Sequence, residues 1–391
     1  MNLLSIEFLL TSLLFVFPLG NLVRIPIYQE VTILPSDIIL GLILIISLKK
    51  YWQERTIQLL SEFKALLVLV TILLTSLLAN LSYQSEISLM VSVLYIVRFL
   101  LYTQLLFVFR WVKKDFKEKF LIRMLLAGGV TVVLGLLQYF FAPDLRPYTV
   151  YGWDEHYRRL FGTFLDPNFF GIFLVMYFFS LLGWMQKVKK TPPLFLVTLI
   201  MTLVAVFLTY SRSSYLALAG GGLVYFLLSK QRRFLGIFLV ASLVIFILIP
   251  KNRSSEGVNL LRTASIQGRT DEFNRAVIMI KDNPLLGVGF NSLRYVRQRY
   301  GFTETINSEN HAAAGIPNSF LFITVTAGLL GLGAYLNVWR LIIQRIHLQT
   351  SRLTRSLLLA SIAALFISAL FENSLFYPLI MLWIFPLLAI W

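Results

Sequence analysis

Runs of roughly 20 apolar residues recur along the whole chain, and this pattern limits the folds open to it. Hydrophobic residues make up 58% of the sequence and charged residues only 14%, whereas a typical soluble domain carries about 25% charged residues. Helices satisfy their own backbone hydrogen bonds in lipid, and these runs are too long for the strands of a membrane barrel. The sequence therefore predicts an all-α polytopic membrane protein.

We predict about twelve transmembrane helices in a single membrane domain over residues 1–391. The first apolar segment has neither a basic start nor a small-residue cleavage site, so we predict a retained span and not a cleaved signal. The predicted spans cover residues 3–19, 31–48, 63–80, 87–109, 120–142, 168–186, 194–209, 214–228, 234–250, 316–339, 355–371 and 375–391.

The distribution of Lys and Arg orients these spans. With the N-terminus in the cytoplasm, seventeen Lys and Arg fall in the predicted inner loops and five in the short outer loops. This asymmetry follows the positive-inside rule and predicts a multi-pass protein with both termini cytoplasmic. Most of the net charge of +16 then reflects membrane topology and needs no nucleic acid to explain it. The predicted inner loops are 49–56, 110–119, 187–193, 229–233 and 340–354.

Residues 251–315 form a large external loop between the ninth and tenth predicted spans, and nine Lys and Arg lie in it. Long structured loops between helices usually carry function. Part of the loop has the apolar spacing of an amphipathic helix, whose apolar face we expect to rest on the membrane or on the spanning bundle. That face comprises Phe273, Ala276, Val277 and Ile280, with Asp271 and Glu272 in the predicted first turn and Asn283-Pro284 ending the helix.

Two arginines in predicted outer segments are candidates for phosphate binding. Arg212 follows Ser211 at the start of a predicted span, where Arg and Ser donors suit a phosphate group. The alternative is an Arg that reaches to lipid headgroups. Arg269, at the start of the amphipathic helix, could reach a substrate phosphate or a headgroup, or could remain solvated.

A second group of candidates precedes the sixth predicted span. Arg158 and Arg159 lie in an aromatic-rich segment, and Asp166-Pro167-Asn168 forms a turn that can begin a helix. These side chains could bind substrate, or the segment could be an interfacial loop anchored by Tyr and Trp.

Other polar residues lie near the tenth span and inside the fourth. His311 lies in a loop of small residues, Asn318 opens the tenth span, and Gly328 and Gly331 could allow close helix packing. Arg98 lies near the middle of the fourth span, where a charge implies either an ion pair or a substrate contact.

Several classes of site are excluded or not predicted. The absence of Cys excludes disulfides and thiolate metal ligands. The outer acids show no metal-ligand spacing, so we predict neither a metal nor another cofactor. The segment GVGFNSLR lacks the βαβ context of a nucleotide-binding fingerprint.

Four segments, in this order, resemble motifs of the O-antigen ligase and O-antigen or exopolysaccharide polymerase superfamily of bacterial inner-membrane proteins. Together with the predicted topology, the resemblance covers most of the chain. In one respect the chain departs from the family pattern, because Pro317 stands where the family has His before Asn318. The four segments are GTFLDPNFFG (162–171), Ser211-Arg212 with Leu216, Gly268-Arg269 with NPLLGVG (283–289), and Asn318 followed by Gly328 and Gly331.

The resemblance implies a glycosyltransferase C-like fold and a metal-independent glycosyltransferase at the outer face of the membrane. Its expected partners are an undecaprenyl pyrophosphate-linked glycan, a glycan acceptor, membrane lipids and other polysaccharide-assembly proteins, with no nucleic acid. Arg212 and Arg269 would stabilise the leaving pyrophosphate, and His311 is the candidate base. Arg158, Arg159, Asn168, Ser211, Asn318 and Arg98 would bind substrate.

Three functions remain open at this point. A polysaccharide polymerase would extend one lipid-linked chain, and Pro317 favours this interpretation over a ligase. A ligase would transfer the glycan to a lipid or protein acceptor in lipopolysaccharide biosynthesis. A lipid-linked glycan flippase would favour inverted repeats, broken midplane helices and paired intramembrane charges. In this sequence intramembrane charges are sparse, and the candidate polar groups cluster outside the spans.

Overall fold

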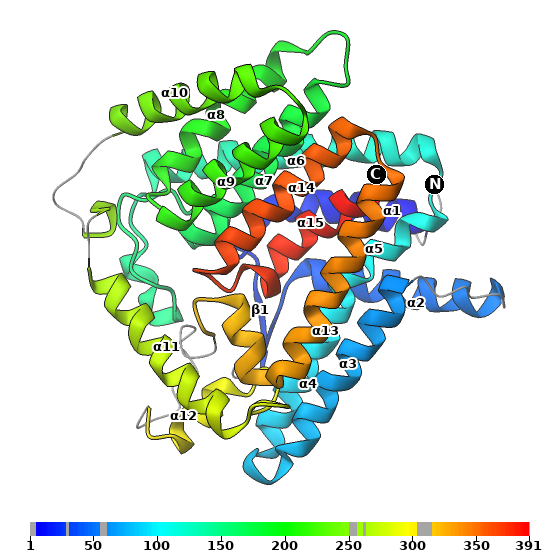
Figure 1. Cartoon of the computed structure of the whole chain (residues 1–391), viewed down its shortest axis with the longest axis vertical. Helices are drawn as coiled ribbons and strands as arrows, with labels where there is room; N and C mark the ends of the chain where they lie inside the picture. Colours follow the sequence, from blue (N-terminus) through cyan, green and yellow to red (C-terminus); the bar gives the residue numbers. More distant parts are fainter. Residues whose placement is uncertain are drawn as a thin grey trace.

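The computed structural model describes residues 5–28, 31–54, 61–249, 256–260, 263–302 and 315–390. Each predicted span overlaps one of twelve helices of this structure (Figure 1), and the span 87–109 also includes the short helix α5 (Leu105–Val108). The twelve helices are α1 (Ile6–Val16), α2 (Pro35–Glu54), α3 (Ser61–Ala79), α4 (Glu86–Thr103), α6 (Lys114–Phe141), α7 (Pro167–Met185), α8 (Pro193–Leu208), α9 (Arg212–Leu228), α10 (Arg232–Leu248), α13 (Ser319–Gln349), α14 (Arg352–Ala369) and α15 (Pro378–Ile390).

Shorter elements connect them. They are the helices α5 (Leu105–Val108), α11 (Ala264–Asp282) and α12 (Leu293–Arg299), together with 3₁₀ turns at Phe17–Leu19, Leu81–Tyr83, Phe109–Trp111, Arg146–Tyr151, Gly162–Phe164, Glu256–Val258 and Ser374–Phe376.

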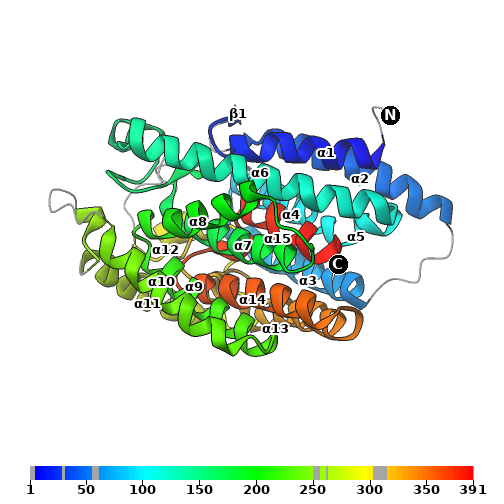
Figure 2. The same cartoon turned by 90° about the horizontal axis from the view of Figure 1, so that it is seen from above.

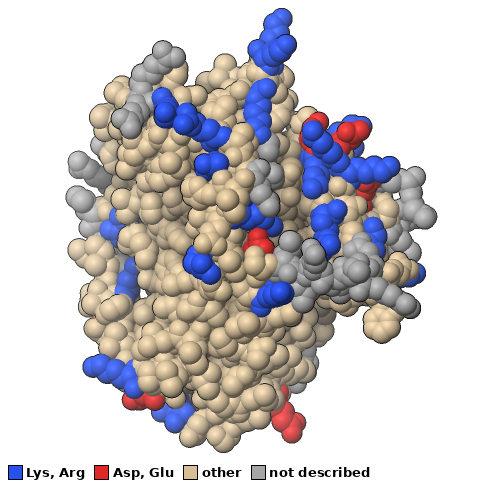
Figure 3. Space-filling view, turned by 45° about the vertical axis from the view of Figure 1, so that its right-hand side comes forward, with Lys and Arg blue, Asp and Glu red and all other residues tan. Residues whose placement is uncertain are grey.

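The helices confirm an all-α polytopic membrane protein. Six of those described are long and apolar enough to cross a membrane. Figure 3 shows wide uncharged areas between separate groups of Lys and Arg on one face. Several other apolar helices, such as α8 and α15, are shorter than a full crossing needs, so the count of twelve spans stays a prediction. The six are Ser61–Ala79, Glu86–Trp111, Lys114–Phe141, Pro167–Met185, Ser319–Leu348 and Arg352–Ala369.

The predicted start of the second span, at residue 31, was wrong. Val31–Ile33 form a strand, β2, which pairs antiparallel with β1 (Ile25–Tyr28), and α2 begins only at Pro35. Three consecutive β-branched residues, Val-Thr-Ile, favour a strand over a helix, and Pro35 suits a first helical position. An apolar composition alone does not distinguish the two structures.

The helices form three layers, which Figure 2 shows from above. The helices α1 and α6 cover one side, α7 and α15 lie in the middle, and α9, α13 and α14 form the other side, where α14 packs along α9. Aromatic rings fill the middle layer. Phe173 stacks on Tyr177 at 5.9 Å between ring centroids and meets Trp383 edge-on at 5.1 Å.

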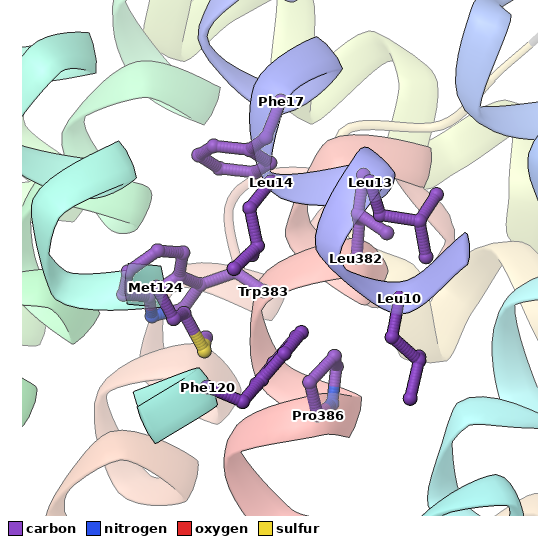
Figure 4. A pocket seen from close by; sticks show the side chains of 9 residues that line it. All are labelled: Leu10, Leu13, Leu14, Phe17, Phe120, Met124, Leu382, Trp383 and Pro386. Carbon is purple, nitrogen blue, oxygen red and sulfur yellow. The ribbon is translucent and has the colours of Figure 1, made fainter. Parts of the chain in front are cut away.

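The packing between α1, α6 and α15 leaves a small apolar cavity of about 10 Å³ (Figure 4). A volume of this size holds at most one water, and the lining offers few polar atoms to bind one. We therefore assign the cavity to core packing. Its lining residues are Leu10, Leu13, Leu14, Phe17, Phe120, Met124, Leu382, Trp383 and Pro386.

The helix α13 is interrupted at Gly328, which has φ 69° and ψ −173°. In a continuous helix the N–H groups of Leu329 and Leu330 would donate to the carbonyls of Val325 and Thr326. Here a loop, residues 284–289, replaces both bonds. Leu329 donates to the Pro284 carbonyl at 2.9 Å, and Leu330 donates to the Leu285 carbonyl at 3.3 Å.

The two carbonyls on the other side of the break also find partners in this loop. Val288 donates to Val325 at 2.9 Å and Gly289 donates to Thr326 at 3.1 Å. The loop 284–289 thus satisfies the interrupted backbone, as a helix break within a membrane protein requires. The predicted role of Gly328 in helix–helix packing was wrong, because Gly328 contacts this loop.

We expect Gly328→Ala to destabilise the protein by about 2–5 kcal/mol, because strain at positive φ adds to overpacking. A Cβ at this position would meet the Leu285 carbonyl oxygen, 2.0 Å away. Thermal unfolding of purified protein in detergent measures the effect. Gly333→Ala is the matched control, since its Cβ meets nothing within 4 Å. Equal melting temperatures for the two variants would contradict this assignment.

Candidate functional site

The described part of the predicted external loop contains two helices, α11 and α12, which lie at the lower left of the molecule in Figure 1. The helix α11 begins at Ala264, so the prediction that Asp271 and Glu272 occupy its first turn was wrong. The predicted end was correct, because α11 stops at Asp282, just before Asn283-Pro284.

The buried face of α11 agrees in part with the predicted one. Ala276 is buried and Ile280 packs against the core, as predicted. Met279 is also buried, whereas Phe273 is 55% exposed. On the buried side Glu272 accepts from Arg297 of α12 at 2.5 Å, and Arg297 also donates to the Gly315 carbonyl at 2.8 Å. Ion-pair and hydrogen-bond contacts therefore hold α11 in addition to apolar packing. The spacing of hydrophobic residues in the sequence could not indicate these polar contacts.

Arg269 connects α11 to the segment between α14 and α15. Its Nη2 atom lies 2.5 Å from Oε1 of Glu372, in the segment between α14 and α15. The Arg269 side chain is 31% exposed and the Glu372 side chain 11% exposed. The pair therefore joins a solvent-accessible guanidinium to a buried carboxyl group.

Burial raises the pKa of Glu372 to about 8, although the neighbouring Arg269 opposes that shift. Asp166 raises this pKa further and Arg159 lowers it. Glu372 is thus electrostatically coupled to three charged side chains from distant parts of the sequence. Burial likewise raises the pKa of Asp166, to about 6, although this carboxyl accepts the backbone N–H groups of Asn168 and Phe169.

Arg159 is buried, with only 3% of its surface exposed. Its Nε donates to the Thr209 carbonyl at 2.9 Å, and its Nη2 lies 3.4 Å from Oδ1 of Asn168. The structure thereby brings Arg159 and Asn168 next to the turn that leads into α9. There Ser211 caps the helix by accepting from the Ser214 N–H at 3.4 Å.

Asn318 caps α13 by accepting from the Leu321 N–H at 2.9 Å and donates to the Leu370 carbonyl at 3.1 Å. The next residue, Ser319, donates to the carbonyl of Glu372 at 3.1 Å. The start of α13 therefore positions the segment that carries Glu372. We call Arg159, Asp166, Asn168, Arg269, Asn318 and Glu372 the arginine–carboxylate centre.

Tyr377 closes one side of this centre. Its ring stacks on Phe169 with 3.9 Å between ring centroids, and its hydroxyl accepts from Nδ2 of Asn21 at 2.6 Å. Nδ2 of Asn21 also donates to the Phe164 carbonyl at 2.8 Å. Residues from the beginning, middle and end of the sequence thus meet at this site.

Three other predicted site residues, Arg212, Arg158 and Arg98, do not belong to the arginine–carboxylate centre. Arg212, the first residue of α9, donates to the Leu260 carbonyl at 3.3 Å. Arg158 is exposed, with its guanidinium 5.3 Å from the Tyr157 ring centroid. Arg98 pairs with Asp37 at 2.6 Å and joins α4 to α2. This ion pair is one of the two alternatives that the sequence left open for Arg98. His311 lies outside the described residues.

The sequence analysis missed Glu372 as a site residue and did not identify Asp166 as a titratable group of the centre. An acid at the end of an apolar segment was the available signal. The structure also places ligand atoms of Asp154, His156 and Asp166 within 4.8 Å of one another, a geometry that could hold a metal ion. The absence of a metal therefore stays a prediction.

The fold and this centre define a polytopic membrane protein with buried Arg and carboxyl groups near the ends of several helices. Residues 196–336 match a family model described as O-antigen ligase. This match spans Arg212, Arg269, Asn318 and the Gly328 break, and it confirms the resemblance to the O-antigen ligase and polymerase superfamily. It supports glycan transfer of the ligase or polymerase type by a multi-pass membrane enzyme, with lipid-linked glycan and membrane lipids as the implied substrates. No curated protein matches the chain.

The raised pKa of Glu372 predicts a pH-dependent stability. Between 4.5, the ordinary value for Glu, and about 8 the folded protein binds more protons than the unfolded chain. The free energy of unfolding should therefore fall as pH rises through this interval, by up to about 1.4 kcal/mol per pH unit, and level off above it.

Thermal unfolding of the detergent-purified protein between pH 5 and 9 measures this dependence. Glu372→Gln should flatten the profile, because its amide does not titrate. Glu118→Gln, at an exposed position on α6, should leave the profile unchanged. Identical slopes for wild type and Glu372→Gln would overturn the assignment of a raised pKa.

Proposed function

We propose that this protein is a polysaccharide polymerase of the bacterial cytoplasmic membrane. In the proposed reaction, a hydroxyl of one lipid-linked repeat unit attacks the anomeric carbon of a second glycan, which is bound to undecaprenyl pyrophosphate. A glycosidic bond forms, the bond from the anomeric carbon to the phosphate oxygen breaks, and the lipid pyrophosphate leaves. The observation that carries this proposal is the contact between Arg269 and the protonatable, buried Glu372.

The leaving pyrophosphate needs positive charge that is fixed before the reaction begins. Arg269 is suited to this role because its guanidinium is held in place by Glu372 yet remains 31% exposed. Planar guanidinium groups bind phosphate oxygens in pairs, which makes Arg preferable to Lys here. Arg159 lies deeper in the centre and adds positive charge, and Arg212 begins the helix on the other side of the Thr209–Ser211 turn.

The acceptor hydroxyl must lose a proton during the attack. Glu372 is our candidate base, because a pKa of about 8 makes its ionised form a stronger base than an ordinary carboxylate, close to the operating pH. Its backbone is tied to Ser319, two residues after Pro317. A carboxylate in this neighbourhood could serve in place of the His that the family pattern has at position 317. His311 remains the alternative base.

The arrangement of the helices is compatible with the proposed topology. Figures 1 and 2 show the start of α1 and the end of α15 on the side of the molecule away from α11 and α12. The proposal therefore keeps both termini cytoplasmic and the centre at the outer face. Other polysaccharide-assembly proteins are proposed as partners.

The ligase alternative is favoured by one specific observation, which is the description of the matching family model as O-antigen ligase. A ligase would use the same arginines on the same lipid pyrophosphate and would differ in its acceptor.

Arg269→Ala should reduce polymer formation at least about 100-fold, because it removes a donor to the developing negative charge. Arg212→Ala should act in the same direction. Gel analysis of surface glycans from complemented cells measures polymer, and immunoblotting of membranes measures the inserted protein. Arg340→Ala removes a charge of the same kind from the exposed surface of α13 and should leave the glycan ladder intact. A wild-type ladder from both Arg212→Ala and Arg269→Ala would refute the proposed roles.

A strain that lacks the protein should distinguish polymerase from ligase. For a polymerase, single repeat units should remain on the carrier or on the acceptor. For a ligase, full-length polymer should accumulate on the carrier without reaching an acceptor. Glycan that stays on the cytoplasmic side would contradict both functions and support a flippase.

A further inference from the structure

The segment 143–158, between α6 and the arginine–carboxylate centre, forms a loop with a closed base. Asp144 and Tyr157 form a β-bridge, Leu145 donates to the His156 carbonyl at 2.8 Å, and Arg158 donates to the Pro143 carbonyl at 2.8 Å. These contacts fix both ends of the loop. We call residues 146–155, which lie between these ends, the aromatic loop.

The aromatic loop exposes ring surface that the rest of the fold does not use. Tyr148 is 52% exposed and Tyr151 is 68% exposed, and their ring centroids lie 6.5 Å apart with 34° between the planes. By contrast, Tyr177 and Tyr225 of the bundle are fully buried. Two neighbouring exposed rings of this kind offer a flat apolar surface to a ligand that carries both C–H and polar groups.

Planar polar side chains accompany these rings. Asp154 and Glu155 are exposed, and Arg146 is held by Asp144 at 2.7 Å, with its guanidinium 4.3 Å from the Tyr157 ring centroid. Carboxylate and guanidinium groups can accept from and donate to neighbouring hydroxyls. Aromatic faces beside such groups match the two surfaces of a pyranose ring, which are its C–H face and its hydroxyl edge.

The charge of the segment argues against a lipid surface as its main ligand. Residues 143–158 contain three acids and two arginines in a chain whose net charge is +16. Attraction to anionic lipid depends on clustered Lys and Arg, and this segment lacks such a cluster. Its composition suits a neutral or hydroxyl-rich ligand better than a layer of headgroups.

The aromatic loop also lies next to the proposed reaction centre. Arg159 follows the base of the loop directly, and Asp154 is close enough to Asp166 for the two carboxylates to interact electrostatically. A glycan whose pyrophosphate lies at Arg159 and Arg269 would therefore have its sugars near this loop.

We propose that Tyr148 and Tyr151, with Asp154 and Glu155, bind the oligosaccharide part of the lipid-linked substrate. This assignment rests on the proposed function for the identity of that substrate. The two tyrosines supply the stacking surface, and the two acids select the orientation of the sugar hydroxyls. The arginine–carboxylate centre then handles the pyrophosphate, so that separate parts of the protein recognise the two ends of the substrate.

The test measures binding of a delipidated oligosaccharide, which is the repeat unit released from its carrier by mild acid. The full-length protein is purified in detergent, and saturation-transfer NMR with titration gives the affinity. The double variant Tyr148→Ala/Tyr151→Ala should bind about tenfold more weakly, because two ring contacts are lost. The double variant Tyr148→Phe/Tyr151→Phe keeps the rings and should retain most of the affinity.

Trp52→Ala is the matched control. It removes an exposed ring, 85% exposed, from the far end of α2, and it should bind as the wild type does. Wild-type affinity in the double Ala variant would overturn the proposal, as would a wild-type protein that binds no oligosaccharide. A double Ala variant that binds normally but is depleted from the membrane fraction would overturn it in favour of a membrane anchor.

The same assay separates this proposal from the proposed function. The delipidated probe has no pyrophosphate, so Arg269→Ala should bind it normally. If Arg269→Ala and Arg212→Ala both make normal polymer while Tyr148→Ala/Tyr151→Ala loses oligosaccharide binding, the proposed roles of the two arginines are wrong. The proposed binding of oligosaccharide by the aromatic loop is then still supported. If the arginine variants lose polymer while the ring variants bind normally, the aromatic loop assignment fails alone.

Discussion

The interrupted backbone of α13 is the constraint on which the placement of α11 and the arginine–carboxylate centre depends. A helix break leaves donors and acceptors that lipid cannot satisfy. The loop 284–289 pairs with four of them beside Gly328, and Ser76 of α3 also donates to the Thr326 carbonyl. The loop 284–289 follows α11 directly. The hydrogen bonds that this loop makes at the break therefore also fix the position of the end of α11. Arg269 near the start of α11 can then meet Glu372, which Ser319 at the start of α13 holds in place. The arginine–carboxylate centre is thus assembled around one broken helix.

This dependence gives a physical reason for Gly287 in the segment NPLLGVG (283–289) and for Gly328 in α13. Gly287 has φ 67°, and a Cβ there would lie 2.4 Å from the Val325 carbonyl oxygen, so the loop approaches the broken helix more closely than a side chain permits. Gly328 supplies the matching conformation on the other side. Gly287 and Gly328 therefore serve one contact between two segments that lie about 40 residues apart in the sequence. Neither glycine would be needed without the other.

The sequence predicted the helices far better than it predicted the centre. Apolar runs locate helices because lipid enforces the pattern over many residues. The strand Val31–Ile33 escaped notice because its composition is equally apolar. Asn318 was found because a capping residue occupies a fixed local position, and Asn168 was found because it follows the cap Asp166 in the same turn. Glu372 was missed because its importance comes from Arg269, about 100 residues away, and no local pattern encodes that meeting. The buried face of α11 was partly misjudged for a similar reason, since Arg297 and not lipid covers part of it.

The contact between Asn21 and Tyr377 has a consequence for how the protein is made. The ribosome synthesises Asn21 and Phe169 long before Tyr377, which immediately precedes the last described helix, α15. A nascent chain therefore lacks one wall of its centre until Tyr377 has been synthesised and placed. Chains that stop before Tyr377 cannot close this part of the fold, so they do not present a complete centre.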